Sequence, residues 1–471
     1  MKILHTSLEC YPFAKVGGLG DVVGSLPKYL NNIECTTEVI IPLYDNDKIK
    51  AQKLETIYTG DVTLGETSFD FSIKKSKFTA LGFHIYFVDI PLLLFRPGVY
   101  AYPDDTERFV SFQLAILDWL VSLEAKPDVV HCHDHHTGLI PFMVLHVEKY
   151  KSLYHIPTVL TIHNAQYQGG FSYDKLNYIP PFNFDHAGLL DWDHHINPLA
   201  TAIKCATMVN TVSPSYMEEL QEQANGLEGL LSHEKAKCIG ILNGIDDSTW
   251  DPETDPMIIK NYSISTLTSG RKANKKWLCE EFDLDINKPL FGFIGRLVYE
   301  KGADLLPDII SEALSNSDIN ILILGSGNAD VEIDLIALKQ KFSGRYNTFI
   351  GYDERLSHIV YAGADFLLMP SRVEPCGLNQ MFSLRYGLIP IVRSIGGLKD
   401  TVVDIGDNGF GICHRNASVE DVCYSINRGI ELYSDQKKYR EIQKKSMKID
   451  NSWNNAAKQY KELYKSLKHL K

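Results

Sequence analysis

Several features of secreted and membrane proteins are missing from this sequence. Its nine cysteines are odd in number, scattered, and without a CxxC pair, so they predict reduced thiols in a cytoplasmic chain and no disulfide framework. The N-terminus lacks the apolar block of a signal peptide. Apolar runs such as residues 91–95 and 320–324 are far shorter than the roughly 18 residues of a membrane span. We therefore expect a cytoplasmic protein with no membrane partner.

An excess of basic residues is also missing. Lys and Arg number 47 against 59 Asp and Glu, which gives a net charge of -12. A dedicated nucleic-acid binder needs a basic surface to neutralise phosphates, so nucleic acid is excluded as a partner. Local basic pockets remain possible, and phosphorylated small molecules are not excluded. At roughly 150 residues per domain, the 471 residues predict two or three domains, and 44% apolar residues are typical of globular protein.

Short apolar segments alternate with longer amphipathic ones along the chain. In the second half the segments LFGFIG (290–295), INILILG (319–325), NTFIG (347–351), ADFLLM (364–369) and IPIVR (389–393) predict parallel strands that are covered on both faces. The gaps between them suit crossover helices, which predicts a doubly wound α/β sheet. The first half repeats this pattern with longer connections and a β-hairpin region around residues 55–90.

The domain organisation follows from these two series of strands. A segment rich in Gly, Asp and Pro, NGIDDSTWDPETDP, separates them and is interpreted as a linker over residues 243–256. We predict an N-terminal domain over 1–242, a C-terminal domain over 257–450, and a final helix over 451–471. Within that helix, apolar side chains recur at spacings of four and three and indicate a docked face, namely Trp453, Ala457, Tyr460, Tyr464 and Leu467.

Two glycine-rich turns carry cations at the ends of predicted strands. The first contains Lys15, Gly17, Gly18 and Asp21 before a helix, and the second runs from Gly295 to Gly302. Glycine lets backbone N–H groups approach an oxyanion closely, and a helix N-terminus favours negative charge. Either turn alone is common and its cations could simply be solvated. Together, at strand ends of two α/β domains, they favour a phosphate site; the cations of the second turn are Arg296 and Lys301.

A carboxylate and a histidine run follow other strands. Glu374 stands in PSRVEPCGLNQ (370–380), where it could accept sugar hydroxyls, stabilise a cationic transition state or cap a helix. In HCHDHH (131–136), the imidazoles of His131, His133 and His135 would alternate onto one face if the strand continued, so zinc is one interpretation. Three ligands so close on one strand rarely surround a single ion, and we expect no metal.

Seven segments together resemble bacterial glycogen synthases and plant starch synthases. They are KVGGLGDV, HCHDHH, HNAQYQG, ILNGID, GRLVYEKG, PSRVEPCGLNQ and GGLKDTV, and their order fits the chain from residue 2 to about residue 460. The resemblance implies an α/β fold of the GT-B type, with two Rossmann-like domains whose parallel sheets face each other across a deep interdomain cleft. It also implies that the C-terminal helix packs back on the first domain.

The resemblance further implies glucosyl transfer from ADP-glucose to the non-reducing end of an α-1,4-glucan (glycogen or a maltooligosaccharide), with retention and without a metal or other cofactor. Lys15, Arg296 and Lys301 are implied at the leaving diphosphate, and Asp134 near the acceptor. His163 and Glu374 are implied at the transferred glucose. The remaining implied substrate-binding residues are Gly17, Gly18, Asp21, Asn164, Tyr352, Cys376, Gly377, Leu378 and Asn379.

Departures from the family pattern leave alternatives open. His135 stands where Trp is common, and Asn379 where Thr is usual. The chain could therefore be another retaining GT-B enzyme that uses UDP-glucose or a different acceptor. An inactive glucan-binding protein is a third reading, which the intact site residues disfavour. Oligomeric state is not indicated by the sequence.

Overall fold

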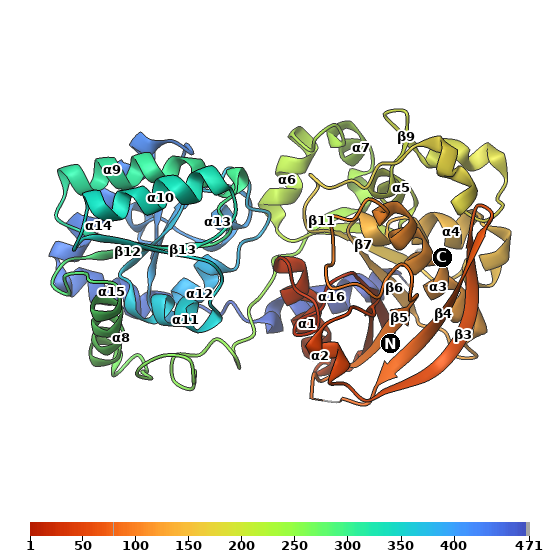
Figure 1. Cartoon of the computed structure of the whole chain (residues 1–471), viewed down its shortest axis with the longest axis horizontal. Helices are drawn as coiled ribbons and strands as arrows, with labels where there is room; N and C mark the ends of the chain where they lie inside the picture. Colours follow the sequence, from red (N-terminus) through yellow and green to blue (C-terminus); the bar gives the residue numbers. More distant parts are fainter. Residues whose placement is uncertain (79, 468–471) are drawn as a thin grey trace. The chain divides into compact units, whose positions relative to one another are not determined.

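The computed structural model describes residues 1–78 and 80–467, and the chain divides into two compact units (Figure 1). Unit 1 comprises Met1–Asn243 and Trp453–Lys471, and unit 2 comprises Gly244–Ser452. The predicted linker falls at this division, and its residues 244–256 are counted with unit 2. The predicted final helix is α16 (Trp453–Ser466); residues 468–471 of that prediction lie outside the described residues.

Unit 1 is built on a nine-stranded sheet with the order β11-β10-β7-β6-β1-β2-β5-β4-β3. Neighbouring strands are parallel except for the predicted hairpin β3–β4 and its pairing to β5. The strands are β1 (Lys2–Thr6), β2 (Thr36–Pro42), β3 (Leu54–Leu64), β4 (Thr67–Ser76), β5 (His84–Asp89), β6 (Val129–His133), β7 (Thr158–Ile162), β10 (Met208–Thr211) and β11 (Cys238–Gly240). A separate two-stranded sheet pairs β8 (Asp191–Trp192) with β9 (His195–Ile196).

The helices of unit 1 connect and cover these strands. They are α1 (Gly18–Asn31), α2 (Asp47–Lys50), α3 (Asp105–Ser122), α4 (Ile140–His146), α5 (Pro198–Cys205), α6 (Pro214–Glu222), α7 (Glu228–His233) and α16. The apolar face predicted for α16 is confirmed, because Trp453, Tyr460 and Tyr464 are buried in one cluster with Ile3 of β1 and Val22 of α1. The end of the chain is therefore part of the core of its first unit.

Unit 2 is built on a fully parallel six-stranded sheet with the order β14-β13-β12-β15-β16-β17. The strands are β12 (Leu290–Ile294), β13 (Asn320–Gly325), β14 (Tyr346–Ile350), β15 (Phe366–Met369), β16 (Ile389–Arg393) and β17 (Ile412–His414). Five of them coincide with the apolar segments seen in the sequence. Their side chains are nearly continuously apolar because both faces of a parallel sheet are covered by helices.

Helices lie on both faces of this sheet, with α9 and α10 on one side and α11 and α12 on the other (Figure 1). The helices of unit 2 are α8 (Leu267–Glu281), α9 (Leu306–Asn316), α10 (Ala329–Lys341), α11 (Glu354–Gly363), α12 (Asn379–Tyr386), α13 (Gly396–Thr401), α14 (Val419–Ser434) and α15 (Gln436–Ser446). The predicted α/β class, with two domains built on largely parallel sheets, is confirmed.

The cysteines and the longest helices bear on the cellular setting of the chain. All nine cysteines are free thiols. Within residues 1–78 and 80–467, no helix is both long enough and apolar enough to cross a lipid bilayer.

Candidate active site

In unit 1 the predicted site residues follow three neighbouring strands. β7, β6 and β1 are adjacent in the sheet and parallel, so their carboxyl ends lie at the same edge. Lys15 lies in the loop after β1, Asp134 follows β6, and His163 follows β7. This edge, where the strand order reverses, is where open α/β sheets bind their ligands.

A buried carboxylate organises the first glycine turn. Glu9 is 3% exposed, and its Oε2 accepts hydrogen bonds from the backbone N–H of Val16 (2.6 Å) and Gly17 (3.0 Å). The hydroxyl of Tyr100 donates to Oε1 at 2.7 Å. Burial raises the pKa of Glu9. Two N–H groups of the predicted phosphate turn are therefore held by the protein's own carboxylate, a role that no pattern in the sequence indicates for Glu9.

The space beside the paired glycines is open, as close approach of a ligand requires. A Cβ atom added at Gly17 or Gly18 would meet no heavy atom within 4 Å. Lys15 Nζ lies 2.7 Å from Asp21 Oδ1, with side chains that are 34% and 28% exposed. The sequence placed both residues at the donor, and the structure joins them in an ion pair. Partly exposed pairs of this kind contribute about 0–1 kcal/mol, so this pair is weak.

Asp134 anchors the turn that carries His163. Its Oδ1 accepts the backbone N–H of His163 at 2.7 Å and that of Asn164 at 3.4 Å. Asp134 has φ +56°, in the left-handed region that favours glycine. The side chain is buried, and burial raises its pKa to about 7. The structure thus brings together Asp134, His163 and Asn164, which the resemblance had implied as separate contacts.

The histidine run does not form the alternating face that the zinc interpretation requires. β6 ends at His133, and His135 begins a short 3-10 helix (His135–Thr137), so His135 leaves the line of the strand. Its place beside His131 and His133 is taken by His5 of β1. One ring nitrogen from each of these three residues lies within 4.8 Å of the other two. To hold a metal ion, His131 and His133 would each have to give up a hydrogen bond of a ring nitrogen.

Both ring nitrogens of His131 are engaged in hydrogen bonds. Nδ1 is bonded to the hydroxyl of Tyr464 at 2.7 Å, and Nε2 to Thr161 Oγ1 at 2.5 Å. Thr161 in turn donates to Asn210 Oδ1 at 2.6 Å, so the Thr161 oxygen accepts from His131. These bonds tie α16 to the centre of the unit 1 sheet, and they give His131 a structural role.

In unit 2 the two charged residues predicted at the reaction are in contact. Lys301 Nζ lies 2.6 and 2.7 Å from the two carboxylate oxygens of Glu374. The hydroxyl of Ser371 donates to Glu374 Oε2 at 3.0 Å. Glu374 is 5% exposed, whereas the Lys301 side chain is 27% exposed. The pair lies beyond the carboxyl ends of β12 and β15, which are neighbours in the sheet.

The loop that carries Glu374 is fixed to the Lys301 turn by its backbone. The N–H groups of Arg372 and Val373 both donate to the carbonyl of Glu300, at 2.8 and 3.1 Å. Gly302 has φ +68°, and a Cβ there would lie 2.4 Å from Pro370 O. The final glycine of GRLVYEKG is therefore required for the close approach of the two loops.

The GGLKDTV segment supports the other side of the same loop. The N–H of Gly397 donates to the carbonyl of Glu374 at 3.1 Å. A Cβ at Gly396 would lie 2.0 Å from Glu374 O, and one at Gly397 would lie 2.1 Å from Cys376 O. These glycines hold the backbone of the PSRVEPCGLNQ loop, a role that the sequence alone did not indicate for the GGLKDTV segment.

The other predicted residues of unit 2 differ in their burial and contacts. Asn379 donates from Nδ2 to the carbonyl of Ile294, at the end of β12, at 2.7 Å. Cys376 is buried, and Arg296 is exposed just after β12. Tyr352 is 76% exposed and follows β14, which is separated from β15 by two strands.

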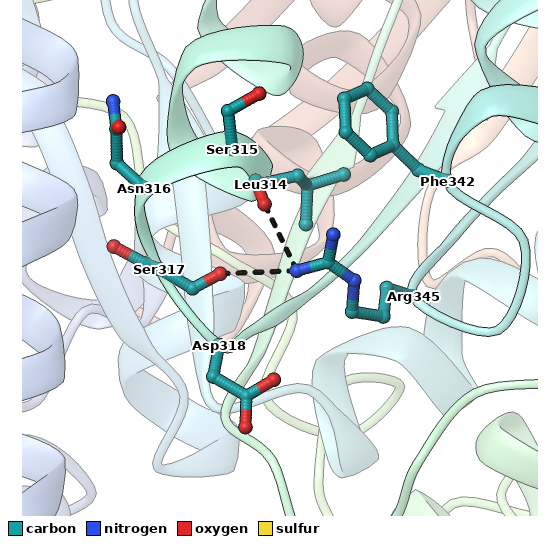
Figure 2. Close-up of a pocket in the computed structure, with 7 residues that line it drawn as sticks. All are labelled: Leu314, Ser315, Asn316, Ser317, Asp318, Phe342 and Arg345. Atoms are coloured by element: carbon teal, nitrogen blue, oxygen red, sulfur yellow. Dashed lines mark hydrogen bonds between the residues drawn. The ribbon is translucent and has the colours of Figure 1, made fainter.

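Two cavities lie elsewhere. One is lined by residues at the end of α9 and by Arg345, which donates to the carbonyls of Leu314 at 2.9 Å and Ser317 at 3.3 Å (Figure 2). Arg345 thereby caps the last carbonyls of α9. The other lies in unit 1 beside β3, α3 and residues 173–184. Neither is lined by a predicted site residue, so the candidate site is defined by the strand ends.

The raised pKa of Asp134 predicts a pH-dependent stability. An aspartate whose folded pKa is about 7, against about 3.9 unfolded, stabilises the fold below pH 4, and this contribution is lost as pH rises to 7. Asp134→Asn should therefore raise the melting temperature by a few degrees at pH 8 and by much less at pH 5. Thermal melts at both pH values measure the difference.

A matched variant is available at Asp104. Its pKa is lowered by the hydrogen-bonded Arg96 guanidinium, so Asp104→Asn should lower stability at pH 8. Equal gains for Asp134→Asn at pH 5 and pH 8 would contradict the assignment.

Comparisons with known proteins agree with this architecture. Residues 2–233 match the model of the starch synthase catalytic domain, and residues 279–448 match that of glycosyl transferases group 1. A glycogen synthase of Flavobacterium johnsoniae is 53% identical over 98% of both chains, and one of Acholeplasma laidlawii is 37% identical over 99% of both. The catalytic domain of starch synthase IV from Arabidopsis thaliana, bound to ADP and acarbose, superposes with a TM-score of 0.90 at 32% identity over 99% of both chains.

A more distant structure, a sucrose-phosphate synthase of Thermosynechococcus elongatus, shares the fold with a TM-score of 0.65 at 15% identity, over the full length of both chains. Two units built on largely parallel sheets, with charged residues at the carboxyl ends of their central strands, together with these matches define a glycosyltransferase of the GT-B fold. Within that class, the chain belongs to the family of bacterial glycogen synthases and plant starch synthases. It is a glucosyltransferase.

Proposed function

We propose that this chain transfers the glucosyl group of ADP-glucose to the non-reducing end of an α-1,4-glucan, with retention of configuration. The observation that carries this proposal is the Lys301–Glu374 pair, a buried carboxylate held at 2.6 Å by a partly exposed cation. Support for an adenine nucleotide and a glucan comes from the Arabidopsis relative, whose structure contains ADP and acarbose. A cytoplasmic location stays a prediction of the sequence.

The leaving diphosphate needs positive charge, and we assign this role to Lys15, Arg296 and Lys301. Preorganised cations stabilise the charge that develops when a phosphate departs. Lys15 and Lys301 are each paired with a carboxylate, at 2.7 Å and 2.6 Å, which keeps their ammonium groups in place before the donor arrives. Donor binding would exchange Asp21 and Glu374 for phosphate oxygens and free both carboxylates for sugar hydroxyls.

At the glucosyl group, Glu374 and His163 are the proposed contacts. The sugar becomes oxocarbenium-like as the bond to phosphate breaks, and a carboxylate stabilises that positive charge. We propose that the acceptor hydroxyl attacks from the face that the diphosphate leaves, and that a departing phosphate oxygen takes the hydroxyl proton. Asp134 is assigned to the acceptor side. Further substrate contacts are assigned to Gly17, Gly18, Asn164, Tyr352, Cys376, Gly377 and Leu378.

The family departures acquire structural explanations that bear on specificity. Asn379 donates to Ile294 O, so its amide holds the turn that leads to Arg296. The ring of His135 lies against Gly169, where an added Cβ would be 2.3 Å from His135 Cδ2. The imidazole of His135 is smaller than the Trp ring that is common at this position, so we expect altered stacking with the acceptor. Asn379 acts on the donor side through the backbone.

The proposal is tested by following labelled glucose from ADP-glucose and from UDP-glucose into glycogen, in parallel and with EDTA present. We expect incorporation from ADP-glucose, at a rate that EDTA leaves unchanged because three side-chain cations supply the charge. Preference for UDP-glucose would overturn the donor assignment. Loss of activity with EDTA would overturn the metal-free mechanism. Failure of both donors, with maltooligosaccharides added, would favour another acceptor or a glucan-binding protein.

A further inference from the structure

Four histidines gather beside the candidate site of unit 1. His5 comes from β1, His131 and His133 come from β6, and His163 follows β7. The first three are fully buried, while His163 is partly exposed. Their strands are neighbours in the sheet, which places the imidazole rings in contact. His131 is held by its bonds to Tyr464 and Thr161. The other three histidines are hydrogen-bonded to one another.

Three of these rings form a hydrogen-bonded line that ends at the site. His5 Nδ1 and His133 Nε2 are joined at 3.0 Å, and His133 Nδ1 and His163 Nε2 at 2.9 Å. His133 thus uses both of its ring nitrogens within the line. Among residues 1–78 and 80–467, the side chain of His163 is hydrogen-bonded through Nε2 and not through its other nitrogen, Nδ1. His163 is also fixed through its backbone N–H, which donates to Asp134.

The three rings are neutral at pH 7, because burial lowers the pKa of His5 and His163 to about 3 and that of His133 well below its usual value. A neutral imidazole carries a single N–H. Each of the two bonds needs one proton, so the line has two possible polarities. In one, every proton is on Nδ1 and the line donates toward His163. In the other, every proton is on Nε2 and the line donates toward His5.

The far end of the line decides between these polarities. His5 Nε2 is buried and, among the described residues, has no hydrogen-bond partner. If the line donated toward His5, this atom would carry a buried N–H with nothing to accept it, which is rare and costly in folded proteins. If the line donates toward His163, the same atom carries only an unused lone pair. Donation toward His163 is therefore favoured, and it puts a proton on His163 Nδ1.

We propose that His5 and His133 are positioning residues that hold His163 as its Nδ1–H tautomer, so that His163 donates a hydrogen bond to a hydroxyl or ring oxygen of the bound sugar. The inference rests on the proposed function, which puts His163 at the transferred glucose. In this state Nε2 is occupied by His133 and Nδ1 is already protonated. His163 therefore orients the sugar and does not remove the proton of the acceptor hydroxyl.

Two replacements of His133 separate this role from simple packing. The amide of asparagine occupies the place of Nδ1, so His133→Asn can still donate to His163. The amide of glutamine occupies the place of Nε2, so His133→Gln keeps the contact to His5 and loses the donor to His163. His131→Gln is the matched control, because His131 is equally buried on the same strand and lies outside the line.

The first readout is the tautomer itself, measured without substrate by long-range nitrogen–proton correlation on protein labelled with ¹⁵N-histidine. The His163 signals are identified by their loss in His163→Asn. We expect Nδ1 to be protonated in the wild type, in His133→Asn and in His131→Gln, and this state to be lost in His133→Gln. A wild-type His163 protonated on Nε2 would overturn the line's polarity, and that measurement needs no variant to fold.

The second readout is glucosyl transfer. The kcat of His133→Gln should fall about tenfold, the effect of one misplaced hydrogen bond, while His133→Asn and His131→Gln keep wild-type kcat. If the tautomers are as expected and His133→Gln keeps the wild-type kcat, the proposed hydrogen bond from His163 to the sugar is wrong. The hydrogen-bonded line of histidines would be unaffected by that result. Wild-type protein with the expected tautomer but no transfer from any glucose donor would overturn the proposed function alone.

Discussion

Replacing Glu374 with alanine should reduce glucosyl transfer about a thousandfold, the size of effect seen when one preorganised electrostatic group is removed from an active site. The carboxylate is buried and held by Lys301 and Ser371, so it already has the place that a cationic sugar requires. Its loss removes stabilisation that is strongest in the transition state, and kcat should fall more than KM rises. Steady-state kinetics with ADP-glucose and glycogen measure the effect.

The fold should survive this change, because Lys301 is partly exposed and remains hydrated when unpaired. Asp304→Ala is the matched control. Asp304 pairs with Arg372 of the same loop at 2.5 Å and is not a predicted site residue, so its loss should change kcat less than about threefold. Glu374→Gln should resemble Glu374→Ala if the negative charge is what matters. If Glu374→Ala keeps the wild-type kcat, Glu374 is not part of the active site.

Lys15→Ala should lower kcat/KM for ADP-glucose about a hundredfold or more, because it removes a cation from the leaving diphosphate. The structure predicts little change in stability, since the Lys15–Asp21 pair is partly exposed. Lys15→Arg should recover part of the activity, because it keeps the charge on a longer and planar group. Kinetics over a range of ADP-glucose concentrations, with thermal melts, test both expectations.

Lys48 offers a close control for Lys15. The two ammonium groups lie over the same Tyr11 ring, at 5.5 and 5.6 Å from its centre, and Lys48 is not a predicted site residue. Lys48→Ala should leave kcat/KM unchanged. An equal loss in both variants would mean that the effect comes from net charge or from the Tyr11 contact, and Lys15 would lose its assigned role.

Much of the fold could be predicted because its signal is local. A strand such as LFGFI in β12 is buried on both faces, and a continuous apolar run between turn residues reports this burial directly. The short strands β11 and β17 carry too few residues for such a pattern. The composition of residues 243–256 predicted a linker, yet Trp250 stacks between His358 and Phe382 at ring distances of 3.9 and 3.7 Å. Gly, Asp and Pro content does not reveal where a single aromatic ring packs.

The site was predictable in its residue types and less so in its partners. Gly302 and Glu374 stand in motifs whose spacing can be read from the chain. The contact of Lys301 with Glu374 joins residues 73 positions apart, and it depends on β12 and β15 being neighbours. Glu9 gave no signal, because an isolated carboxylate in an N-terminal segment has no distinguishing pattern.

His5 was missed for a related reason. A single histidine in an apolar strand is ordinary, and its meaning appears only when β6 is placed beside β1. Sequence reasoning looked for the third histidine along β6, at His135, whereas the sheet supplies it from the adjacent strand. The register that pairs His5 with His131 is a property of the folded sheet.

In the proposed reaction, ADP leaves as one glucose is added to an α-1,4-glucan with retention. The most direct measurement uses ADP-glucose labelled with ¹³C at the anomeric carbon and maltoheptaose as acceptor, with ADP and product followed together by NMR. We expect one ADP for each glucose added to maltoheptaose, and a new labelled anomeric signal with the coupling of an α linkage. A β-linked product, or ADP release with no lengthening of the acceptor, would contradict the claim.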